Sequence, residues 1–209
     1  MSEPGSVAVA NEEDGAQPLP STAVGVRQAV VTLLAVAAGI IGLDVLTKEL
    51  ATNSLEGHAP LRILGGLVYL SFTRNSGAAW SIGSDYTFIF PIFAIGVAAW
   101  ILWIARKLRS LPWAVALGLV LGGALGNLVD RVFRAPGGFS GHVVDFVSLF
   151  APYGEKFPIF NVADMALSFG VALAIYLEYS GRMRDGTRLP RAGKKAAPPD
   201  PAETAETER

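Results

Sequence analysis

The chain has 209 residues, of which 51% are hydrophobic and only 17% are charged, whereas a soluble domain usually carries about 25% charged residues. This composition indicates a membrane protein, and the formal net charge of −1 leaves no global basic field, so we expect no nucleic-acid partner. The absence of cysteine excludes disulfide bonds, thiolate metal sites and a cysteine nucleophile, and the chain has only two histidines for any other metal site or triad.

Polar tails are predicted at both ends of the chain. Residues 1–25 are acidic and rich in Pro and Gly, and we expect a disordered tail there. A secretory signal peptide would begin with positive charge, but the first cation is Arg27. Residues 181–209 are basic and then rich in Ala, Pro and Glu, which also predicts disorder. The region between them, 26–180, is predicted to form one domain.

Four apolar stretches lie in this region, at 26–46, 88–105, 113–132 and 162–179. Each is close to the ~20 residues that span about 30 Å of hydrocarbon as a helix. Backbone groups in lipid must form hydrogen bonds within their own segment, so all four stretches are predicted to be transmembrane helices. The predicted fold class is therefore an all-α membrane protein with four transmembrane helices.

Lys and Arg near the helix ends predict the orientation, because cytoplasmic loops are enriched in them. We expect both termini in the cytoplasm and the two longer loops outside. The cations that support this follow the second and fourth apolar stretches: Arg106, Lys107, Arg109, Arg182, Arg184, Arg188 and Arg191. The bias is not absolute, since the outer loops also hold Arg62, Arg74, Arg134 and Lys156.

The two outer loops are more than connectors. In the first, 51–87, β-branched and aromatic residues surround Gly65-Gly66 within LRILGGLVYLSFT (61–73), which predicts a hairpin or a small curved sheet. The second, 133–160, is too apolar for a simple tether. We expect its apolar residues to lie at the membrane surface or to pack on the helices.

Two of the four aspartates in or near the apolar stretches have cations close by in the sequence. Ionisable groups in such places are costly and are candidates for function. Asp44 and Lys48 are four residues apart and share a helix face, as an ion pair that anchors the helix end or supports a site. Asp130 lies beside Arg131 and near Arg134, and this charge favours an ionised, structural acceptor over a catalytic acid.

The other two, Asp145 and Asp164, have no cation within four residues and are predicted near the outer membrane boundary. If they face each other, burial and repulsion would raise the pKa of one carboxyl, and the pair would share a proton. An aspartic protease needs this arrangement, in which one carboxylate takes a proton from water and the other protonates the carbonyl oxygen. Spacing alone leaves a purely structural role equally open.

Three asparagines close to apolar segments also need partners, because an unpaired amide in lipid costs several kcal/mol (~2–7). Asn75 and Asn127 are predicted to bond the aspartates, a substrate backbone or each other. Asn161 fits either an N-cap of the last helix or a position in the site. Glycines on the third apolar stretch, Gly122, Gly123 and Gly126, predict close helix packing and not a phosphate-binding loop.

Together these segments resemble the lipoprotein signal peptidases, the type II signal peptidases of bacteria. The resemblance covers about residues 27–180 and has high specificity because five motifs occur in the family's order. They are DVLTK (44–48), RNSGAAW (74–80), GGALGNLVDR (122–131), HVVDF (142–146) and FNVAD (160–164). The sequence departs from the family pattern at Trp80, where Phe is usual, and in its longer tails.

The resemblance implies four transmembrane helices with a small β-element in the first outer loop. It implies an aspartic endopeptidase that cuts diacylglyceryl-modified prolipoproteins just before the lipid-modified cysteine, without a metal or another cofactor. The implied catalytic residues are Asp145 and Asp164. The implied substrate-binding or supporting residues are Asp44, Lys48, Asn75, Gly77, Asn127, Arg131 and Asn161.

The same resemblance implies inhibition by the cyclic peptide globomycin. The expected partners are prolipoprotein substrates and membrane lipid, in the bacterial cytoplasmic membrane, and we expect a monomer. Two other classes of function predict different features. A proton-coupled transporter predicts an internal repeat and carboxylates near the midplane, and a membrane scaffold needs no unpaired carboxylates. A zinc peptidase needs a HExxH-type cluster, which the sequence lacks.

Overall fold

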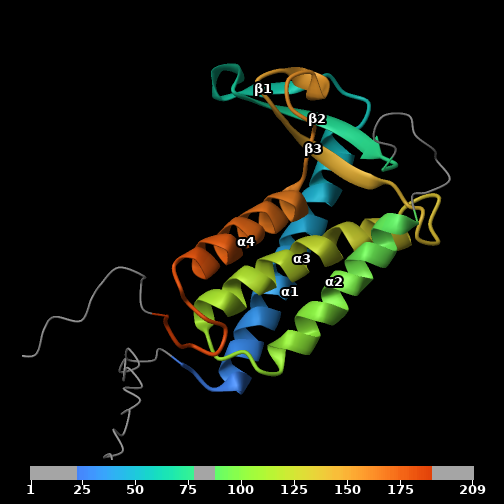
Figure 1. Cartoon of the computed structure of the whole chain (residues 1–209). Coiled ribbons are helices and arrows are strands. Elements are labelled where there is room, and N and C mark those ends of the chain that lie inside the picture. Colours follow the sequence, from blue (N-terminus) through green and yellow to red (C-terminus); the bar gives the residue numbers. More distant parts are fainter. Residues whose placement is uncertain (1–22, 78–87, 190–209) are drawn as a thin grey trace, which may run out of the picture.

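The structure, a computed structural model, describes residues 23–77 and 88–189. Four helices pack side by side, and a small sheet covers one end of the bundle (Figure 1). The helices are α1 (Val26–Leu55), α2 (Ile89–Ala105), α3 (Leu111–Phe133) and α4 (Val162–Tyr179), and the strands are β1 (Leu61–Ile63), β2 (Val68–Asn75) and β3 (Val143–Leu149). The protein is therefore mostly helical, with one three-stranded antiparallel sheet.

Length and composition make three helices, α1, α3 and α4, suitable for crossing a membrane. Helix α2 is also apolar but has 17 residues. Many large side chains on the outside of the bundle are apolar, including Phe93, which is 70% exposed, and Phe169, which is 68% exposed. Such surfaces suit lipid contact and support a membrane location.

Helix α1 continues nine residues beyond the predicted end at 46 and reaches Leu55. The extension is stabilised by packing, because Ala51 and Leu55 are buried against Val144 and Phe146 of β3. The pair of Asp44 and Lys48 therefore lies inside a continuous helix, at the level where the bundle meets the sheet, and not at its end.

Glycines let α3 lie close to two neighbours. A Cβ at Gly122 would lie 2.8 Å from the Cβ of Ile40 on α1, and a Cβ at Gly123 would collide with the carbonyl oxygen of Ala163 on α4. A Cβ at Gly126 would lie 2.8 Å from the Oδ2 of Asp44. The prediction of close helix packing at these three glycines is confirmed, and α3 is the central helix of the bundle.

The predicted hairpin at 61–73 is confirmed by the antiparallel pairing of β1 with β2. Gly65 and Gly66 form the turn with φ angles of +66° and +99°, in the left-handed region that favours glycine. The β-element extends beyond the first long loop, where it was predicted, because β3 comes from the second long loop and pairs with β2. Short 3₁₀ turns at Leu64–Gly66 and Pro152–Gly154 complete this layer.

At the other end of the bundle, the start of α1, the α2–α3 connection and the segment after α4 come together (Figure 1). Residues 181–189, which the sequence analysis placed in the C-terminal tail, form a hydrogen-bonded turn, with an antiparallel bridge between Arg182 and Arg188. The rest of that predicted tail, 190–209, and the predicted N-terminal tail up to residue 22 lie outside the described residues, as does Trp80.

Candidate active site

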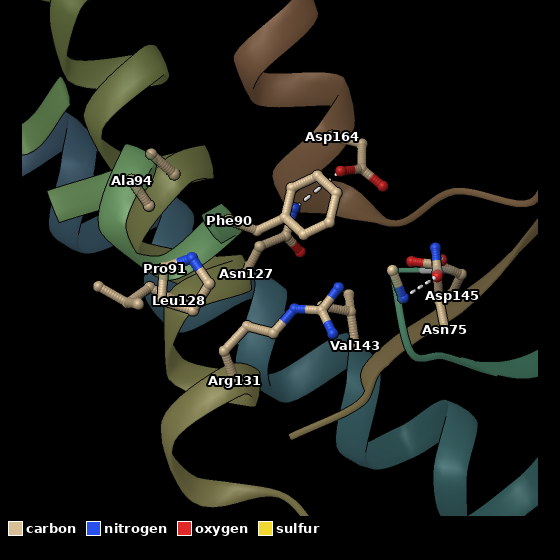
Figure 2. Close-up of a pocket in the computed structure, with 12 residues that line it drawn as sticks. Asn75, Phe90, Pro91, Ala94, Asn127, Leu128, Arg131, Val143, Asp145 and Asp164 are labelled. Atoms are coloured by element: carbon tan, nitrogen blue, oxygen red, sulfur yellow. Dashed lines mark hydrogen bonds between the residues drawn. The ribbon is translucent and has the colours of Figure 1, made fainter. Parts of the chain in front are cut away.

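A pocket of about 550 Å³ opens where the bundle meets the sheet (Figure 2). Its wall combines apolar side chains of α2 and α3 with polar side chains of all the neighbouring elements. The lining residues are Asn75, Gly77, Phe90, Pro91, Ala94, Ala124, Asn127, Leu128, Arg131, Val143, Asp145 and Asp164. Both aspartates that the sequence analysis singled out as a pair therefore reach one cavity.

Asp145 reaches the pocket from the middle of β3 and is only 3% exposed. Its carboxylate accepts hydrogen bonds from two amides, Asn75 Nδ2 at 3.0 Å and Asn161 Nδ2 at 2.6 Å. Burial raises the pKa of Asp145 to about 6, and the nearby charge of Asp164 adds to the rise, while the two amide bonds oppose it. This carboxyl therefore takes up its proton around pH 6.

Asp164 lies in the first turn of α4, where the sequence FNVAD forms a capping box. Asn161 is the N-cap, and its side-chain oxygen accepts from the backbone N–H of Asp164 at 2.9 Å. In return Asp164 Oδ2 accepts from the backbone N–H of Asn161 at 3.1 Å. The remaining oxygen, Oδ1, accepts from Asn127 Nδ2 at 2.8 Å, so both carboxylate oxygens are held in place.

Asn161 connects the two carboxylates, because its side-chain amide donates to Asp145 and its backbone N–H donates to Asp164. The sequence left an N-cap and a role in the site as alternatives for Asn161, and in the structure this residue makes both sets of contacts. Hydrogen bonds to either carboxylate come from amides, and no ion pair to them is found among the described residues. Two carboxylates in such a setting can share one proton.

Arg131 brings a positive charge to the pocket from the last turn of α3. Its Nη1 donates to the carbonyl oxygens of Ser76 and Gly141, at 2.9 and 3.0 Å, and its guanidinium lies 5.7 Å from the ring centre of Phe90. Gly77 fits beside it with φ of +83°, and a Cβ there would lie 2.8 Å from Arg131 Nη2. Arg131 therefore joins three segments around the pocket: the residues that follow β2, helix α2 and the loop before β3.

Comparison with known proteins identifies the family. The family model for signal peptidase (SPase) II matches residues 36–179, which include every residue of the pocket. The chain belongs to the signal peptidase II family. It is therefore a peptidase, and the expectation that the five motifs raised is confirmed.

Close relatives carry the same family name. The lipoprotein signal peptidase of Streptomyces coelicolor is 47% identical over 161 residues, covering 77% of this chain and 76% of the relative. That of Mycobacterium avium is 47% identical over 149 residues, covering 71% and 79%. That of Rhodococcus jostii is 44% identical over 181 residues, covering 85% and 87%.

Two solved structures share the fold, and both are described as bacterial membrane enzymes studied by the in meso method. One, at 1.9 Å resolution, has a TM-score of 0.62 and 28% sequence identity, covering 77% of this chain and 97% of the other. The second, at 2.3 Å resolution, has a TM-score of 0.64 and 26% identity, covering 86% and 100%. These likenesses support a multi-pass membrane enzyme.

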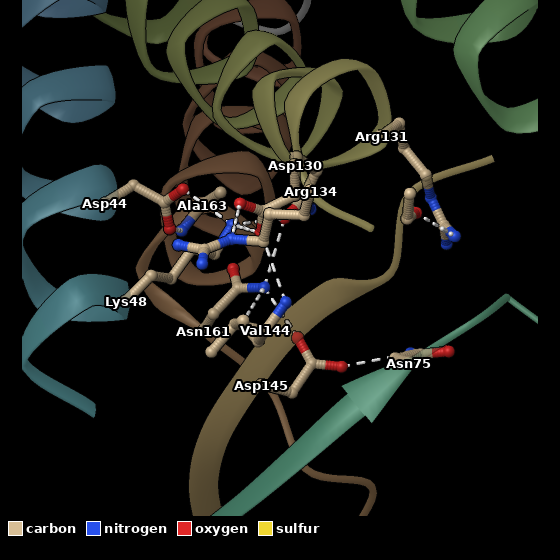
Figure 3. Close-up of polar contacts among 12 residues, drawn as sticks. Asp44, Lys48, Asn75, Asp130, Arg131, Arg134, Val144, Asp145, Asn161 and Ala163 are labelled. Atoms are coloured by element: carbon tan, nitrogen blue, oxygen red, sulfur yellow. Dashed lines mark hydrogen bonds and ion pairs between the residues drawn. The ribbon is translucent and has the colours of Figure 1, made fainter. Parts of the chain in front are cut away.

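A second group of acidic and basic side chains in this signal peptidase lies around Lys48, next to Asn161 (Figure 3). Lys48 is fully buried, and its Nζ lies 2.7 Å from Asp44 Oδ2 and 2.9 Å from Asp130 Oδ2. The predicted ion pair of Asp44 and Lys48 is confirmed. Asp130 accepts structural contacts, as Arg131 and Arg134 close to it in the sequence predicted. Asp130 also binds Arg134 Nε at 2.5 Å and the backbone N–H of Val144 at 3.1 Å.

This buried cluster positions the backbone around both candidate catalytic residues. Asp130 holds the N–H of Val144, directly before Asp145 in β3. Asp44 Oδ1 accepts from the N–H of Ala163 at 2.9 Å, directly before Asp164 in α4. Lys48 completes the link by donating to Asn127 Oδ1 at 3.0 Å, while the other end of that amide donates to Asp164.

Sequence reasoning missed two contributors to the site, Phe90 and the N–H group of Ala163. Phe90 belongs to an apolar run that contains several aromatic residues. No sequence pattern predicts which of them contacts Arg131. Backbone donors have no side-chain signature either. Among the described residues, no group of three or more His, Asp or Glu side chains is arranged as a metal site.

Proposed function

We propose that this protein removes the signal peptide from diacylglyceryl-modified prolipoproteins, by cutting the peptide bond just before the lipid-modified cysteine. The family and the names of the relatives support this reaction. The observation that carries the assignment of the site is that Asp145 and Asp164 line one pocket and are both held by Asn161.

In the proposed mechanism, the two carboxyls share one proton when substrate binds. The ionised carboxylate takes a proton from a water molecule, which attacks the carbonyl carbon of the scissile bond. The protonated carboxyl gives its proton to the substrate, first at the carbonyl oxygen. As the C–N bond breaks, the leaving amine takes the proton that the first carboxylate removed from water, and the hydroxyl formed from the carbonyl oxygen returns its proton to the second carboxylate. No metal is needed. Either aspartate could start as the base, since a coupled pair titrates as a unit.

The supporting residues then have distinct tasks. Asn75 holds Asp145 through Nδ2, while its Oδ1 accepts from the N–H of Gly77 at 2.8 Å, so its contacts suit orientation of the carboxylate. Arg131 lines the pocket and offers its guanidinium to the substrate backbone. The apolar wall of Phe90, Pro91 and Leu128 offers a surface for the substrate's lipid.

We propose that all four helices cross the cytoplasmic membrane, with both termini inside and the pocket near the outer face. At about 1.5 Å per residue, the 17 residues of α2 extend ~25 Å, slightly less than the hydrocarbon thickness. Cations gathered at the end opposite the sheet support this orientation. The protein would work as a monomer, without nucleic acid and without a cofactor, and globomycin would inhibit it.

The test is cleavage of a purified diacylglyceryl-prolipoprotein by wild type, Asp145→Asn and Asp164→Asn. We expect a loss of about 10³-fold or more in either variant, with wild-type cleavage resistant to EDTA and blocked by globomycin. Asp185→Asn is a matched control, because Asp185 is exposed at the opposite end and should leave the rate unchanged. Cleavage that survives either site substitution would overturn the proposed pair, and no wild-type cleavage under any lipid condition would overturn the substrate.

A further inference from the structure

A second cavity, of about 680 Å³, lies at the end of the bundle opposite the candidate active site. It is bounded by the last turn of α2, the residues that follow it, and the turn after α4. Its lining residues are Trp103, Ile104, Arg106, Lys107, Met183, Arg184 and Asp185. The lining therefore includes three cations, one carboxylate and apolar side chains.

The turn that forms one side of this cavity is firmly attached to the bundle. The carbonyl oxygen of Arg184 accepts from the backbone N–H of Arg109 at 2.9 Å, and that of Arg182 accepts from Trp113 Nε1 at 2.7 Å. The guanidinium of Arg184 lies 5.7 Å from the ring centre of Trp113. Arg184 is therefore held in position before any ligand arrives, which reduces the entropy lost on binding.

The charges in the cavity leave an excess of cations for an incoming anion. Asp185 already accepts from the backbone N–H and the hydroxyl of Thr187, at 2.9 and 2.7 Å. Arg106 donates through Nε to the carbonyl oxygen of Trp103 at 3.2 Å, which fixes the start of its side chain. Guanidinium groups suit phosphate oxygens because they donate in a planar fork.

Exposed aromatic residues place this cavity at the level of lipid headgroups. Trp103 is 62% exposed at the end of α2, and Tyr176 and Tyr179 are 61% and 92% exposed at the end of α4. Trp and Tyr are enriched where a helix passes from hydrocarbon into the headgroup layer. The cavity therefore has cations at headgroup depth and, on the bundle side, an apolar wall facing the acyl chains.

We propose that this cavity is a binding site for an anionic phospholipid of the inner leaflet. Arg106, Lys107 and Arg184 bind its phosphate, and the start of an acyl chain lies along Trp103 and Ile104. Basic pockets between helices on the cytoplasmic side of membrane proteins suit such headgroups. A bound lipid would join the end of α2 to the turn after α4.

The experiment titrates the purified full chain in detergent with phosphatidylglycerol, phosphatidylcholine and inorganic phosphate, and follows bound lipid by native mass spectrometry and the thermal midpoint. The site variant is Arg106→Gln/Lys107→Gln/Arg184→Gln. The matched control, Arg109→Gln/Arg182→Gln/Arg188→Gln, removes three exposed cations from the same end that do not line the cavity. Both variants lose the same charge, so they differ only in the cavity.

We expect wild type and control to bind phosphatidylglycerol with affinities within about threefold, and the site variant to bind it about tenfold or more weakly. Phosphatidylglycerol should raise the thermal midpoint of wild type and control but not that of the site variant. Equal losses in both variants would reveal only a general attraction of positive charge and overturn the site. Equal binding of phosphatidylcholine, or of inorganic phosphate, would overturn the assignment to an anionic lipid.

Discussion

Two pairs of aspartates lie next to each other in this bundle, in opposite chemical settings. Asp44 and Asp130 surround the ammonium of Lys48, at 2.7 and 2.9 Å, with no access to the pocket. Asp145 and Asp164 line the pocket and are held by amides. A cation balances the charge of a carboxylate, whereas an amide orients a carboxylate without balancing its charge.

The comparison shows how one protein holds the same side chain in two settings, one in a buried ion-pair cluster and one at the proposed catalytic site. The cation-held pair fixes the backbone before each pocket aspartate, through Val144 and Ala163. The amide of Asn127 joins the two pairs, since it accepts from Lys48 and donates to Asp164. Substitutions in the cluster around Lys48 should therefore lower mainly the stability of the protein. Substitutions that disturb Asp145 or Asp164 should lower mainly its activity.

Removing the cation should have the largest effect. Lys48→Met leaves two buried carboxylates without their shared counter-ion, and breaking a buried ion pair costs about 3–5 kcal/mol. We expect the thermal midpoint in detergent to fall by roughly 10 °C. Lys156→Met is the matched control, because Lys156 is exposed and should change the midpoint little.

A triple variant shows whether the loss comes from uncompensated charge. In Asp44→Asn/Lys48→Met/Asp130→Asn the carboxylates are neutral, and much of the lost stability should return, because replacing a whole buried ionic group is often close to neutral. If Lys48→Met melts with wild type, or if the triple variant melts below Lys48→Met, the cluster does not stabilise the fold in this way.

The extent to which the sequence predicts this cluster follows from residue spacing. Asp44 and Lys48 are four apart on one helix, so their pairing follows from helix geometry. Asp130 contacts Lys48 across 82 positions of sequence, and only the packing of α3 on α1 brings them together. Periodicity and spacing within one sequence therefore do not predict this contact.

The next largest effect is expected when Asn127, whose side-chain amide connects the two pairs of aspartates, is replaced. Asn127→Ala frees Asp164 Oδ1 and removes the acceptor for Lys48 Nζ, while both ion pairs of Lys48 remain. We expect kcat to fall about 100-fold, as for a catalytic group displaced by about 1 Å, with a much smaller change in the thermal midpoint than in Lys48→Met.

Asn53→Ala controls for the loss of an amide, because Asn53 is exposed on the same bundle. The measurement is kcat and KM for a lipid-modified prolipoprotein, together with the midpoint of each variant. A loss of stability as large as that of Lys48→Met, with kcat unchanged in the folded fraction, would assign Asn127 to support and not to positioning.

The dependence of activity on pH tests the amide-held pair itself. The shared proton is present below the pKa of Asp145, about 6, and is lost as the pH rises through that value. We therefore expect kcat/KM for the free enzyme to decline above about pH 6, approaching tenfold per pH unit. Asn75 lowers this pKa by its hydrogen bond, so Asn75→Ala should move the decline to higher pH. A movement to lower pH, or a profile flat to pH 9, would contradict the shared proton.

The fold shows a similar division between what sequence pattern predicts and what it does not. The four helices come from apolar runs of the right length, and the hairpin comes from Gly65-Gly66 between β-forming residues. Strand β3 has the mostly apolar sequence VVDFVSL, which pattern alone does not separate from a membrane-surface segment. Its assignment depends on pairing with β2, some 70 residues earlier, and on cover by the extended α1.

The smallest effect on stability is expected at the exposed edge of the cluster around Lys48, where Arg134 contacts Glu49. Glu49 binds Arg134 Nη2 at 2.7 Å but is half exposed, whereas Arg134 Nε binds the buried Asp130. Exposed ion pairs contribute about 0–1 kcal/mol and weaken with salt, so Glu49→Gln should lower the thermal midpoint by no more than ~2–4 °C, and by less in 0.5 M salt. Arg134→Gln should lower the midpoint further and with little dependence on salt, because it removes a partner from a buried carboxylate. If the two variants show the same fall in thermal midpoint with the same dependence on salt, the contact of Arg134 with Asp130 does not stabilise the fold more than the exposed contact of Arg134 with Glu49.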